Sequence, residues 1–222
     1  ARPQADSARI ATLQEEFAAA QEEAQSYVDA GAFDGLLERE GANGLNAFTS
    51  ADATGYLYSL TANKVELFFA TESERFLYPV FREFYTERDV VMEERRQRTE
   101  SNATGRLVEE FIATAFKAHP YGAPVIGHMS DLETLSITEA EAFFEQYYQA
   151  NNLTIAMAGD VDPDEARALA EQYFSRLPAG EPPLPVMTEE PPQPGERRVT
   201  LVEQSQPIVL IGYHRDGMRS PD

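Results

Sequence analysis

The stretch from Pro178 to Gly195 contains seven prolines, and it limits the folds open to this chain more than any other feature. Proline holds φ at roughly −65° and has no main-chain N–H, so neither a helix interior nor a central strand can run through such a segment. We therefore expect a linker or an extended surface loop at 178–195. Compact domains must be built from the residues on either side of it.

Elsewhere, helical and strand-like patterns alternate. The segments NGLNAFTS (43–50) and TGYLYSLT (54–61) carry β-branched and aromatic residues around the turn-forming Ala51-Asp52-Ala53, which is typical of a hairpin. A continuous apolar run predicts a further strand at 153–159, and the segments 197–204 and 207–214 look like two more strands. Helical periodicity is found at 1–30, 63–78, 86–116, 138–149 and 163–177. This mixture predicts an α+β fold in which helices pack on one side of an antiparallel sheet, together with a long acidic amino-terminal helix.

Two of these helices have recognisable starts. Asp162 followed by Pro163 places a capping carboxylate before a proline in the first helical position, and Thr138 is the expected cap of the preceding helix. In the amino-terminal helix, apolar residues recur at three- and four-residue steps and form one narrow stripe. The stripe consists of Ile10, Leu13, Phe17, Ala20, Ala24 and Val28. This stripe packs either against a preceding antiparallel helix that lies outside this chain or against the surface of its own domain.

Charge and composition exclude several functions. The formal net charge of −20 repels the phosphates of nucleic acids and anionic lipid headgroups. No apolar run approaches the roughly 18 residues of a membrane span, and the amino terminus lacks a signal-peptide pattern. The chain has no cysteine, and none of its three histidines is four residues from another, so a self-contained helical zinc motif is absent. Such a composition suits an exported or periplasmic bacterial protein and equally an ordinary soluble one.

Four segments, in this order, resemble the pitrilysin/insulinase family of zinc metallopeptidases. They contain the N-A-x-T and T-x-Y motifs, a paired-glutamate helix, H-P-Y-G with a later G-x-x-x-D-L, and Y-x-x-N-N with a later G-D. The segments are EGANGLNAFTSADATGY (40–56), ERDVVMEERRQRTESNATGRL (87–107), AFKAHPYGAPVIGHMSDLETLS (115–136) and FFEQYYQANNLTIAMAGDVDP (143–163).

The resemblance implies a zinc site that this chain supplies only in part. In the family, two histidines and a general-base glutamate come from an upstream H-x-x-E-H helix, and a distant glutamate completes the protein ligands. By this resemblance Glu94 is the zinc ligand, and Glu87 is a neighbouring carboxylate that orients the site. Glu93 is the competing ligand, about 100° round the helix. We expect the chain to begin after the H-x-x-E-H motif, and therefore to be inactive alone.

The N-A-x-T match implies a docking edge for substrate. Asn46, Ala47, Phe48 and Thr49 would form the strand to which an extended peptide adds, main chain to main chain. The alternative is an ordinary hairpin strand that its neighbours cover. His119, within His119-Pro120-Tyr121-Gly122, is expected to shape a turn and not to bind metal.

The complete interpretation is part of a zinc-dependent metalloendopeptidase that hydrolyses peptides or unfolded polypeptides. Its partners would be the peptide substrate and the remaining parts of the parent peptidase or a homologous subunit. The expected divisions are an acidic helical insertion (1–30), the peptidase-family domain (31–177), the proline-rich linker (178–195) and the start of a following domain or closing strands (196–222). Two alternatives stay open: a non-catalytic subunit or binding module of the same fold, and a helical adaptor that binds through Leu13 and Phe17.

Overall fold

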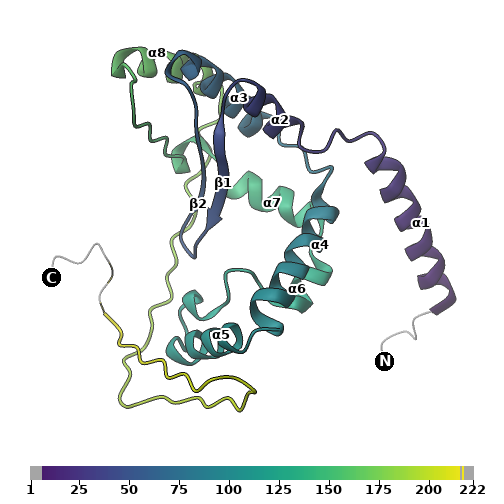
Figure 1. The fold of residues 1–222 in the computed structure, drawn as a ribbon, viewed down its shortest axis with the longest axis vertical. Helices are drawn as coiled ribbons and strands as arrows, with labels where there is room; N and C mark the ends of the chain where they lie inside the picture. Colours follow the sequence, from purple (N-terminus) through teal and green to yellow (C-terminus); the bar gives the residue numbers. More distant parts are fainter. Residues whose placement is uncertain (1–6, 216, 218–222) are drawn as a thin grey trace. The chain divides into compact units, whose positions relative to one another are not determined.

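The computed structural model describes residues 7–215 and 217 (Figure 1). Its α-helices are α1 (Ser7–Gln25), α2 (Ala32–Arg39), α3 (Val65–Leu77), α4 (Phe84–Arg95), α5 (Ala103–Ala115), α6 (Met129–Thr134), α7 (Ile137–Tyr147) and α8 (Pro163–Phe174). Strands β1 (Asn43–Thr49) and β2 (Thr54–Ser59) form a two-stranded antiparallel sheet. Short helical turns are η1 (Ala62–Lys64), η2 (Arg96–Glu100), η3 (Pro120–Gly122) and η4 (Ala150–Asn152). Helices combined with an antiparallel sheet confirm the α+β class.

Contacts divide the chain into two units. The first contains residues 1–47, 56–87 and 136–183, and the second contains 48–55, 88–135 and 184–222. The first therefore holds α1, α2, α3, α7 and α8, and the second holds α5, α6 and the extended carboxyl-terminal segment. The hairpin and α4 contribute residues to both.

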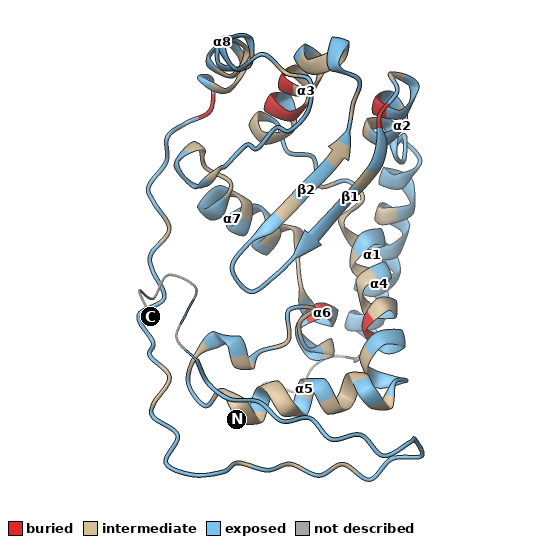
Figure 2. Ribbon diagram, turned by 60° about the vertical axis from the view of Figure 1, so that its left-hand side comes forward, coloured by how far each residue is buried: buried red, intermediate tan, exposed pale blue. Residues whose placement is uncertain are grey.

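The first unit has a small aromatic core between α3 and α8. Phe69 on α3 is 2% exposed, and its ring meets those of Phe68 and Phe174 edge-to-face at 5.3 and 6.1 Å between centroids. Leu37 on α2 is fully buried. Figure 2 shows in red how few residues reach this degree of burial. This unit therefore owes its order to a few aromatic contacts together with the polar contacts described below.

The predicted hairpin is confirmed, and its turn is closed by hydrogen bonds. The Ser50 N–H donates to the Ala53 carbonyl at 2.8 Å, and the Ser50 hydroxyl accepts from the N–H groups of Asp52 and Ala53. Serine side chains of this kind stabilise turns by replacing main-chain partners.

Helix α8 begins as predicted. Asp162 accepts hydrogen bonds from the N–H groups of Asp164 and Glu165, and Pro163 is the first helical residue. The prediction for α7 was wrong in its cap, because Ser136 holds that place and not Thr138. Ser136 and Glu139 form a reciprocal capping box, which satisfies two main-chain donors where a lone threonine would satisfy one.

A single helix over 86–116 was also predicted wrongly. Helix α4 ends at Arg95, the wider π-helical turn η2 follows, and α5 starts anew at Ala103. The break occurs at Asn102, whose extended backbone lets its side chain accept from the N–H groups of Thr104 and Gly105. Asparagine competes with helical main-chain bonds in this way, so it starts one helix and separates it from the helix before it.

The strands predicted at 153–159, 197–204 and 207–214 are absent from the described residues. Those segments carry the expected apolar residues, but they pair with no other strand. Ile211 and Tyr213, for example, are 75% and 85% exposed. A strand is stabilised by its neighbours on either side, so strand-forming residues alone do not produce one.

Helix α1 contacts the start of α4. The Phe17 ring meets the Tyr85 ring edge-to-face at 5.3 Å, and the Gln25 amide donates to the Thr86 hydroxyl at 2.7 Å. These contacts favour the interpretation in which the apolar stripe lies on its own domain. Ile10 and Leu13 on the same stripe remain 43% and 46% exposed.

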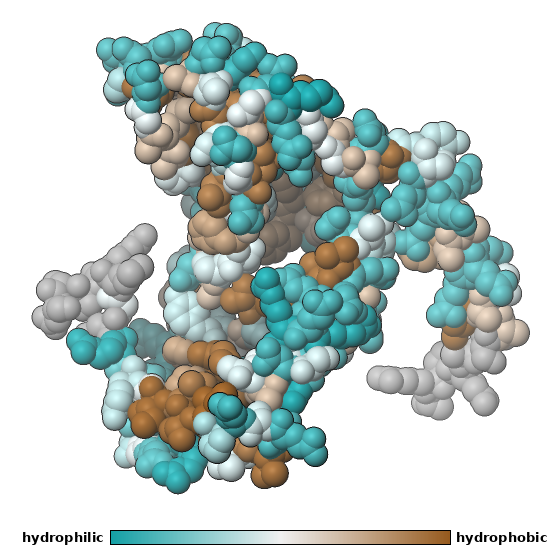
Figure 3. Space-filling view, viewed as in Figure 1, coloured by the Kyte–Doolittle hydropathy of each residue, from teal (hydrophilic) through white to brown (hydrophobic). Residues whose placement is uncertain are grey.

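Apolar side chains also reach the surface elsewhere. Figure 3 shows them in brown over α5, where Val108 is 44% exposed. Among the described helices, none is both long enough and apolar enough to cross a lipid bilayer.

Candidate functional site

The two glutamates singled out by the sequence both lie on α4. They are seven positions apart, and seven steps of about 100° return to the same helix face roughly two turns away. Glu87 is exposed, whereas Glu94 is half-buried in the last turn. The Arg98 guanidinium donates to Glu94 Oε1 at 2.6 Å, and the Glu94 side chain is 37% exposed. Glu94 therefore presents a carboxylate that a stronger cation can reach.

Glu93 is engaged on a different part of the helix surface. Its carboxylate accepts from the Gln97 amide at 3.1 Å and from the Arg96 guanidinium at 3.2 Å. The hydrogen bond from Gln97, and after it the one from Arg96, hold the pKa of Glu93 below its usual value. Both oxygens of Glu93 already have local partners, so Glu93 is the weaker candidate ligand.

Arg95, directly after Glu94, fixes the end of α4. Its side chain is 7% exposed and donates to both oxygens of Glu109 on α5, at 2.9 and 3.0 Å. It also donates to the Gly127 carbonyl at 2.7 Å, and the hydrogen bonds to Glu109 raise the pKa of Arg95. Gly127 has φ +83°, a conformation that favours glycine and that directs this carbonyl. The bidentate ion pair between Arg95 and Glu109 holds the helical turn that carries Glu94.

Sequence reasoning missed the role of Arg95. Arg95 and Arg96 look alike in the run E-E-R-R, and only the packing of α5 separates the buried one from the exposed one. The G-x-x-x-D-L motif contained a partial signal, because Gly127 is its first residue.

The described residues do not form a complete zinc site. Among them, no group of three or more histidine, cysteine, aspartate or glutamate side chains is placed to hold a metal ion. Catalytic zinc uses three protein ligands and one open position, so Glu94 alone does not fit that requirement.

Two of the three histidines, His119 and His214, have contacts that serve the local structure. His119 Nδ1 accepts from the Tyr121 N–H at 3.3 Å and caps η3, while its ring contacts those of Phe116 and Tyr121. His214 stacks on Phe116 at 5.1 Å between ring centroids. The sequence-based view of His119-Pro120-Tyr121-Gly122 as a structural turn is therefore confirmed.

The hairpin register directs the main chain of Ala47 away from β2. Ser50 and Ala53 form a hydrogen-bonded pair, and bonded and non-bonded pairs alternate along an antiparallel ladder. This alternation makes Phe48 and Gly55 the next pair of the hydrogen-bonded type and places Ala47 opposite Tyr56 in a pair of the non-bonded type. The N–H and C=O of Ala47 therefore point toward the open edge of β1.

Contacts around Ala47 agree with this register. The Ala47 N–H donates to the Asn46 side-chain oxygen at 2.9 Å, as expected of a donor outside the ladder. The Phe48 ring covers Gly55, where an added Cβ would lie 2.3 Å from a ring carbon. Residues 46–49 are all exposed, so no described segment covers this strand.

The tip of the hairpin is tied to η3 within the second unit. The Tyr121 hydroxyl donates to Asp52 Oδ2 at 2.7 Å, and this hydrogen bond raises the pKa of Tyr121. The turn of the hairpin is therefore held by the H-P-Y-G segment and not only by its own residues.

The proline-rich stretch is also anchored in the second unit. Glu190 accepts from the consecutive N–H groups of Lys117, Ala118 and His119 at 2.8, 2.8 and 3.0 Å. Desolvation opposes ionisation of this carboxylate, but these bonds prevail and lower the pKa of Glu190 to about 2. Arg197, two residues after this stretch, donates to the Ala115 carbonyl at 2.8 Å and so caps the end of α5.

Comparison with known proteins places these features in a family. A family model described as insulinase, peptidase family M16, matches residues 10–128, and one described as the peptidase M16 inactive domain matches residues 134–222. The zinc protease PqqE of Helicobacter pylori is 33% identical over 202 residues, which cover 87% of this chain and 45% of that protein. An uncharacterized zinc protease of Mycobacterium leprae is 32% identical over 178 residues, covering 78% of this chain and 40% of the relative. The chain thus spans less than half the length of these relatives.

Solved structures agree with the sequence matches. The crystal structure of a protease from Helicobacter pylori has a TM-score of 0.71 and 32% identity, over 77% of this chain and 42% of that one. The first half of the periplasmic protease PqqL from Escherichia coli has a TM-score of 0.58 and 26% identity, over 67% of this chain and 33% of that one. By the extent of the family match, and by the fold that it shares with these proteases, the chain belongs to the insulinase family of peptidases, M16.

Proposed function

We propose that this chain is part of a zinc-dependent metalloendopeptidase that hydrolyses peptides or unfolded polypeptides. Glu94 supplies the third protein ligand to zinc, and Glu87, on the same face of α4, orients the site. Asn46, Ala47, Phe48 and Thr49 form the edge to which the substrate adds as a further strand. The remaining ligands and the general base come from parts of the parent protein outside this chain.

The observation that carries the proposal is the exposure of the Glu94 carboxylate and its pairing with Arg98. Its carboxylate is only half-buried, and its described partner is the exposed Arg98, whose side chain is 75% exposed. An exposed ion pair on a helix is worth only about 0.3–0.5 kcal/mol, so a metal ion would displace Arg98 at little cost. Arg95 meanwhile holds the helix end that carries Glu94, which favours a ligand of fixed position.

Substrate docking at β1 is supported by the register. When no peptide is present, the Asn46 side chain satisfies the outward N–H of Ala47. A peptide carbonyl would take over this donor, and the C=O of Ala47 would accept from the peptide. Main-chain pairing of this kind holds a substrate without reading its side chains, which suits a peptidase that accepts many sequences.

The chain alone would be inactive, because one carboxylate cannot hold catalytic zinc. Its partners would be the rest of the parent peptidase or a homologous subunit, and the apolar side chains exposed along 207–213 would lie against them. Likeness to the periplasmic PqqL supports an exported location. The divisions at 1–30, 31–177, 178–195 and 196–222 remain predictions.

One observation favours the alternative of a non-catalytic subunit of the same fold. Residues 134–222 match a family model described as the peptidase M16 inactive domain. The two proposals differ in the parent protein, because only the enzyme would bind zinc and cleave peptides.

The test is Glu94→Gln in the parent protein, with Glu93→Gln as the matched control. A neutral amide replaces an anionic ligand poorly, so Glu94→Gln should lose most of the metal and reduce turnover at least about a hundredfold. Glu93→Gln, one position away, should retain both. Metal content by atomic absorption and cleavage of a fluorogenic peptide measure the two effects. Normal zinc and turnover in Glu94→Gln would show that the ligand lies elsewhere.

A further inference from the structure

A buried carboxylate in the first unit lies beneath the hairpin. Glu72 on α3 is 5% exposed. It accepts from the Tyr58 hydroxyl at 3.0 Å, and its other oxygen accepts from the Arg75 guanidinium one turn along the helix. Burial and the negative charge of Glu72 raise the pKa of Tyr58. A buried carboxylate requires such partners, so Tyr58 and Arg75 are fixed together.

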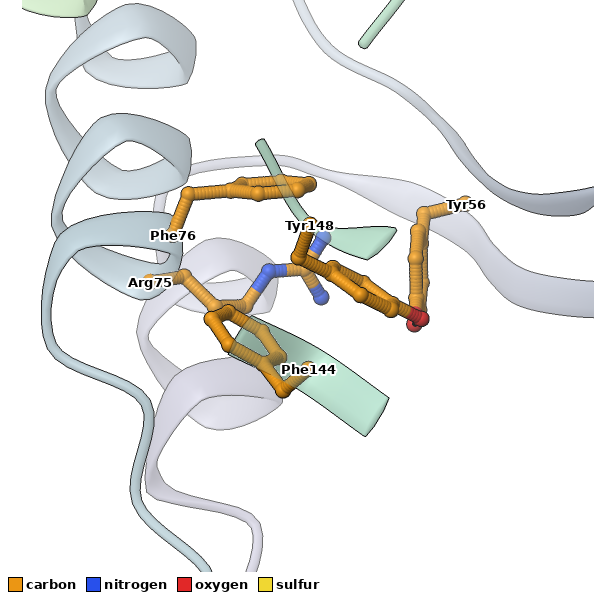
Figure 4. A pocket seen from close by; sticks show the side chains of 5 residues that line it. All are labelled: Tyr56, Arg75, Phe76, Phe144 and Tyr148. Atoms are coloured by element: carbon orange, nitrogen blue, oxygen red, sulfur yellow. Dashed lines mark hydrogen bonds between the residues drawn. The ribbon is translucent and has the colours of Figure 1, made fainter. Parts of the chain in front are cut away.

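Arg75 holds a second tyrosine of the same strand. Its guanidinium lies over the rings of Tyr56 and Phe33, at 4.5 and 4.9 Å from their centroids. The Tyr56 hydroxyl is 2.7 Å from that of Tyr148, which directly follows α7. Figure 4 shows the guanidinium among the rings of Tyr56, Phe76, Phe144 and Tyr148, with the hydroxyls of Tyr56 and Tyr148 meeting at one end. The planar face of arginine suits this stacking, which lysine cannot reproduce.

The space enclosed by these side chains is small. The cavity that Tyr56, Arg75, Phe76, Phe144 and Tyr148 line holds about 70 Å³. Small-molecule sites usually occupy roughly 300–1,000 Å³, so this cluster does not form such a site. Its contacts instead connect β2 to α2, α3 and the end of α7.

The two tyrosines project from the same face of β2. They are two residues apart, and side chains alternate between the faces of a strand. Tyr56 lies opposite Ala47, and Tyr58 lies opposite Leu45, by the hairpin register. The residues held by the Glu72–Arg75 pair are therefore the cross-strand neighbours of the open edge of β1.

We propose that Glu72 and Arg75 are positioning residues for substrate: through Tyr56 and Tyr58 they hold the outward edge of β1 where an extended peptide can pair with it. This inference rests on the proposed docking of substrate at β1. An edge strand in a two-stranded sheet has only one neighbour to order it. Contacts that immobilise this neighbour pre-organise the edge and lower the entropy lost when the peptide binds.

The experiment uses the parent peptidase with Tyr56 and Tyr58 both replaced by phenylalanine. This variant keeps both rings and removes both hydroxyl bonds. The KM for an extended peptide should rise roughly fivefold to tenfold, as expected for the loss of two hydrogen bonds that order the edge, while kcat and zinc content stay unchanged. A peptide too short to reach β1 should show no such change.

Tyr173→Phe is the matched control. The Tyr173 hydroxyl donates to Glu66, also on α3, at 2.8 Å, and this hydrogen bond joins α8 to that helix instead of joining the hairpin to it. It should lower stability by less than the tyrosine variant does, because it loses a single exposed hydrogen bond, and it should leave KM unchanged. Arg75→Lys provides a second variant that retains the charge beside Glu72 while losing the stacked plane, and it should raise KM to an intermediate value.

Four results are informative. A rise in KM limited to the hairpin variants and to extended peptides supports the inference. If Ala47→Pro raises KM but the tyrosine variant does not, the positioning role is overturned and the docking edge stands. If neither change alters KM, docking at β1 fails and the positioning role fails with it. Equal losses of kcat in the tyrosine variant and in Tyr173→Phe would also overturn the inference, because they would indicate a general effect on folding.

Discussion

Helix α4 and strand β1 carry the two candidate sites, and they depend on the rest of the protein in opposite ways. Glu94 on α4 offers a single carboxylate, and its proposed chemistry requires ligands from outside the described residues. Strand β1 offers an open main-chain edge that one turn and one partner strand are enough to form. Metal chemistry requires several side chains to converge, whereas strand pairing requires only one extended backbone with free donors and acceptors.

The supports of the two sites differ as well. Arg95 secures the end of α4 through a nearly buried guanidinium bound to Glu109. The hairpin is held at separate places, through Tyr58 and Glu72 in the first unit and through Asp52 and Tyr121 in the second. We therefore expect a single substitution to damage the helix site more than the hairpin.

The largest predicted effect in this comparison is that of Arg95→Met. The substitution leaves Glu109 and the Gly127 carbonyl without their common donor, so the free energy of unfolding should fall by about 3 kcal/mol. Arg98→Met, which breaks only the exposed pair with Glu94, should change it by less than about 0.5 kcal/mol. Urea denaturation of the parent protein measures both. Equal effects of the two substitutions would show that Arg95 is no special support of α4.

An intermediate effect is predicted for Ala47→Pro, with Ala47→Ser as its control. Proline removes the outward N–H of β1, so the KM of the parent enzyme for extended peptides should rise about tenfold without loss of zinc. Serine keeps the donor and should leave KM unchanged, and Phe48→Leu should matter little because main-chain bonds would carry the proposed recognition. Steady-state kinetics, with circular dichroism to confirm folding, provide the measurement. A folded Ala47→Pro variant with normal kinetics would leave residues 46–49 as an ordinary hairpin strand.

The smallest predicted effect is on stability, at Glu190, which main-chain N–H groups bind. Glu190 is bound by three consecutive N–H groups, and its pKa of about 2 lies below the value of about 4.5 for an unperturbed carboxyl. The folded form therefore favours the charged carboxylate, so its contribution to stability is complete above about pH 4.5 and is lost as the pH falls toward 2.

Glu190→Gln should accordingly lower the melting temperature at neutral pH, by less than Arg95→Met does. The difference from the unsubstituted protein should narrow between pH 4.5 and 2, because protonated glutamate and glutamine are both neutral. Thermal melts of the two proteins over this range measure the effect. A difference that stays constant with pH would contradict the binding of an ionised Glu190 by residues 117–119.

Local patterns in the sequence determined much of this fold. The hairpin at 43–59, the helix before Pro79 and the start of α8 at Asp162-Pro163 each depend on neighbours within a few residues. Turn chemistry, side-chain alternation and capping act over that distance, so the sequence alone predicts them. The same holds for the four motifs, because their residues and their order along the chain are enough to indicate the family.

Other features were decided by tertiary structure, because they depend on residues far apart in the chain. The sequence does not show that Arg95 meets Glu109 or that Glu190 returns to residues 117–119. The apolar residues at 153–159 and 207–214 are not enough to make these segments strands, because a hydrogen-bonded ladder requires a second strand beside each of them. Local patterns are thus enough to indicate which segments have helical or extended character and which residues resemble a family's site. Packing between distant segments sets which charges are buried and which edge of the hairpin stays open, because burial and pairing depend on neighbours in space that are remote along the chain.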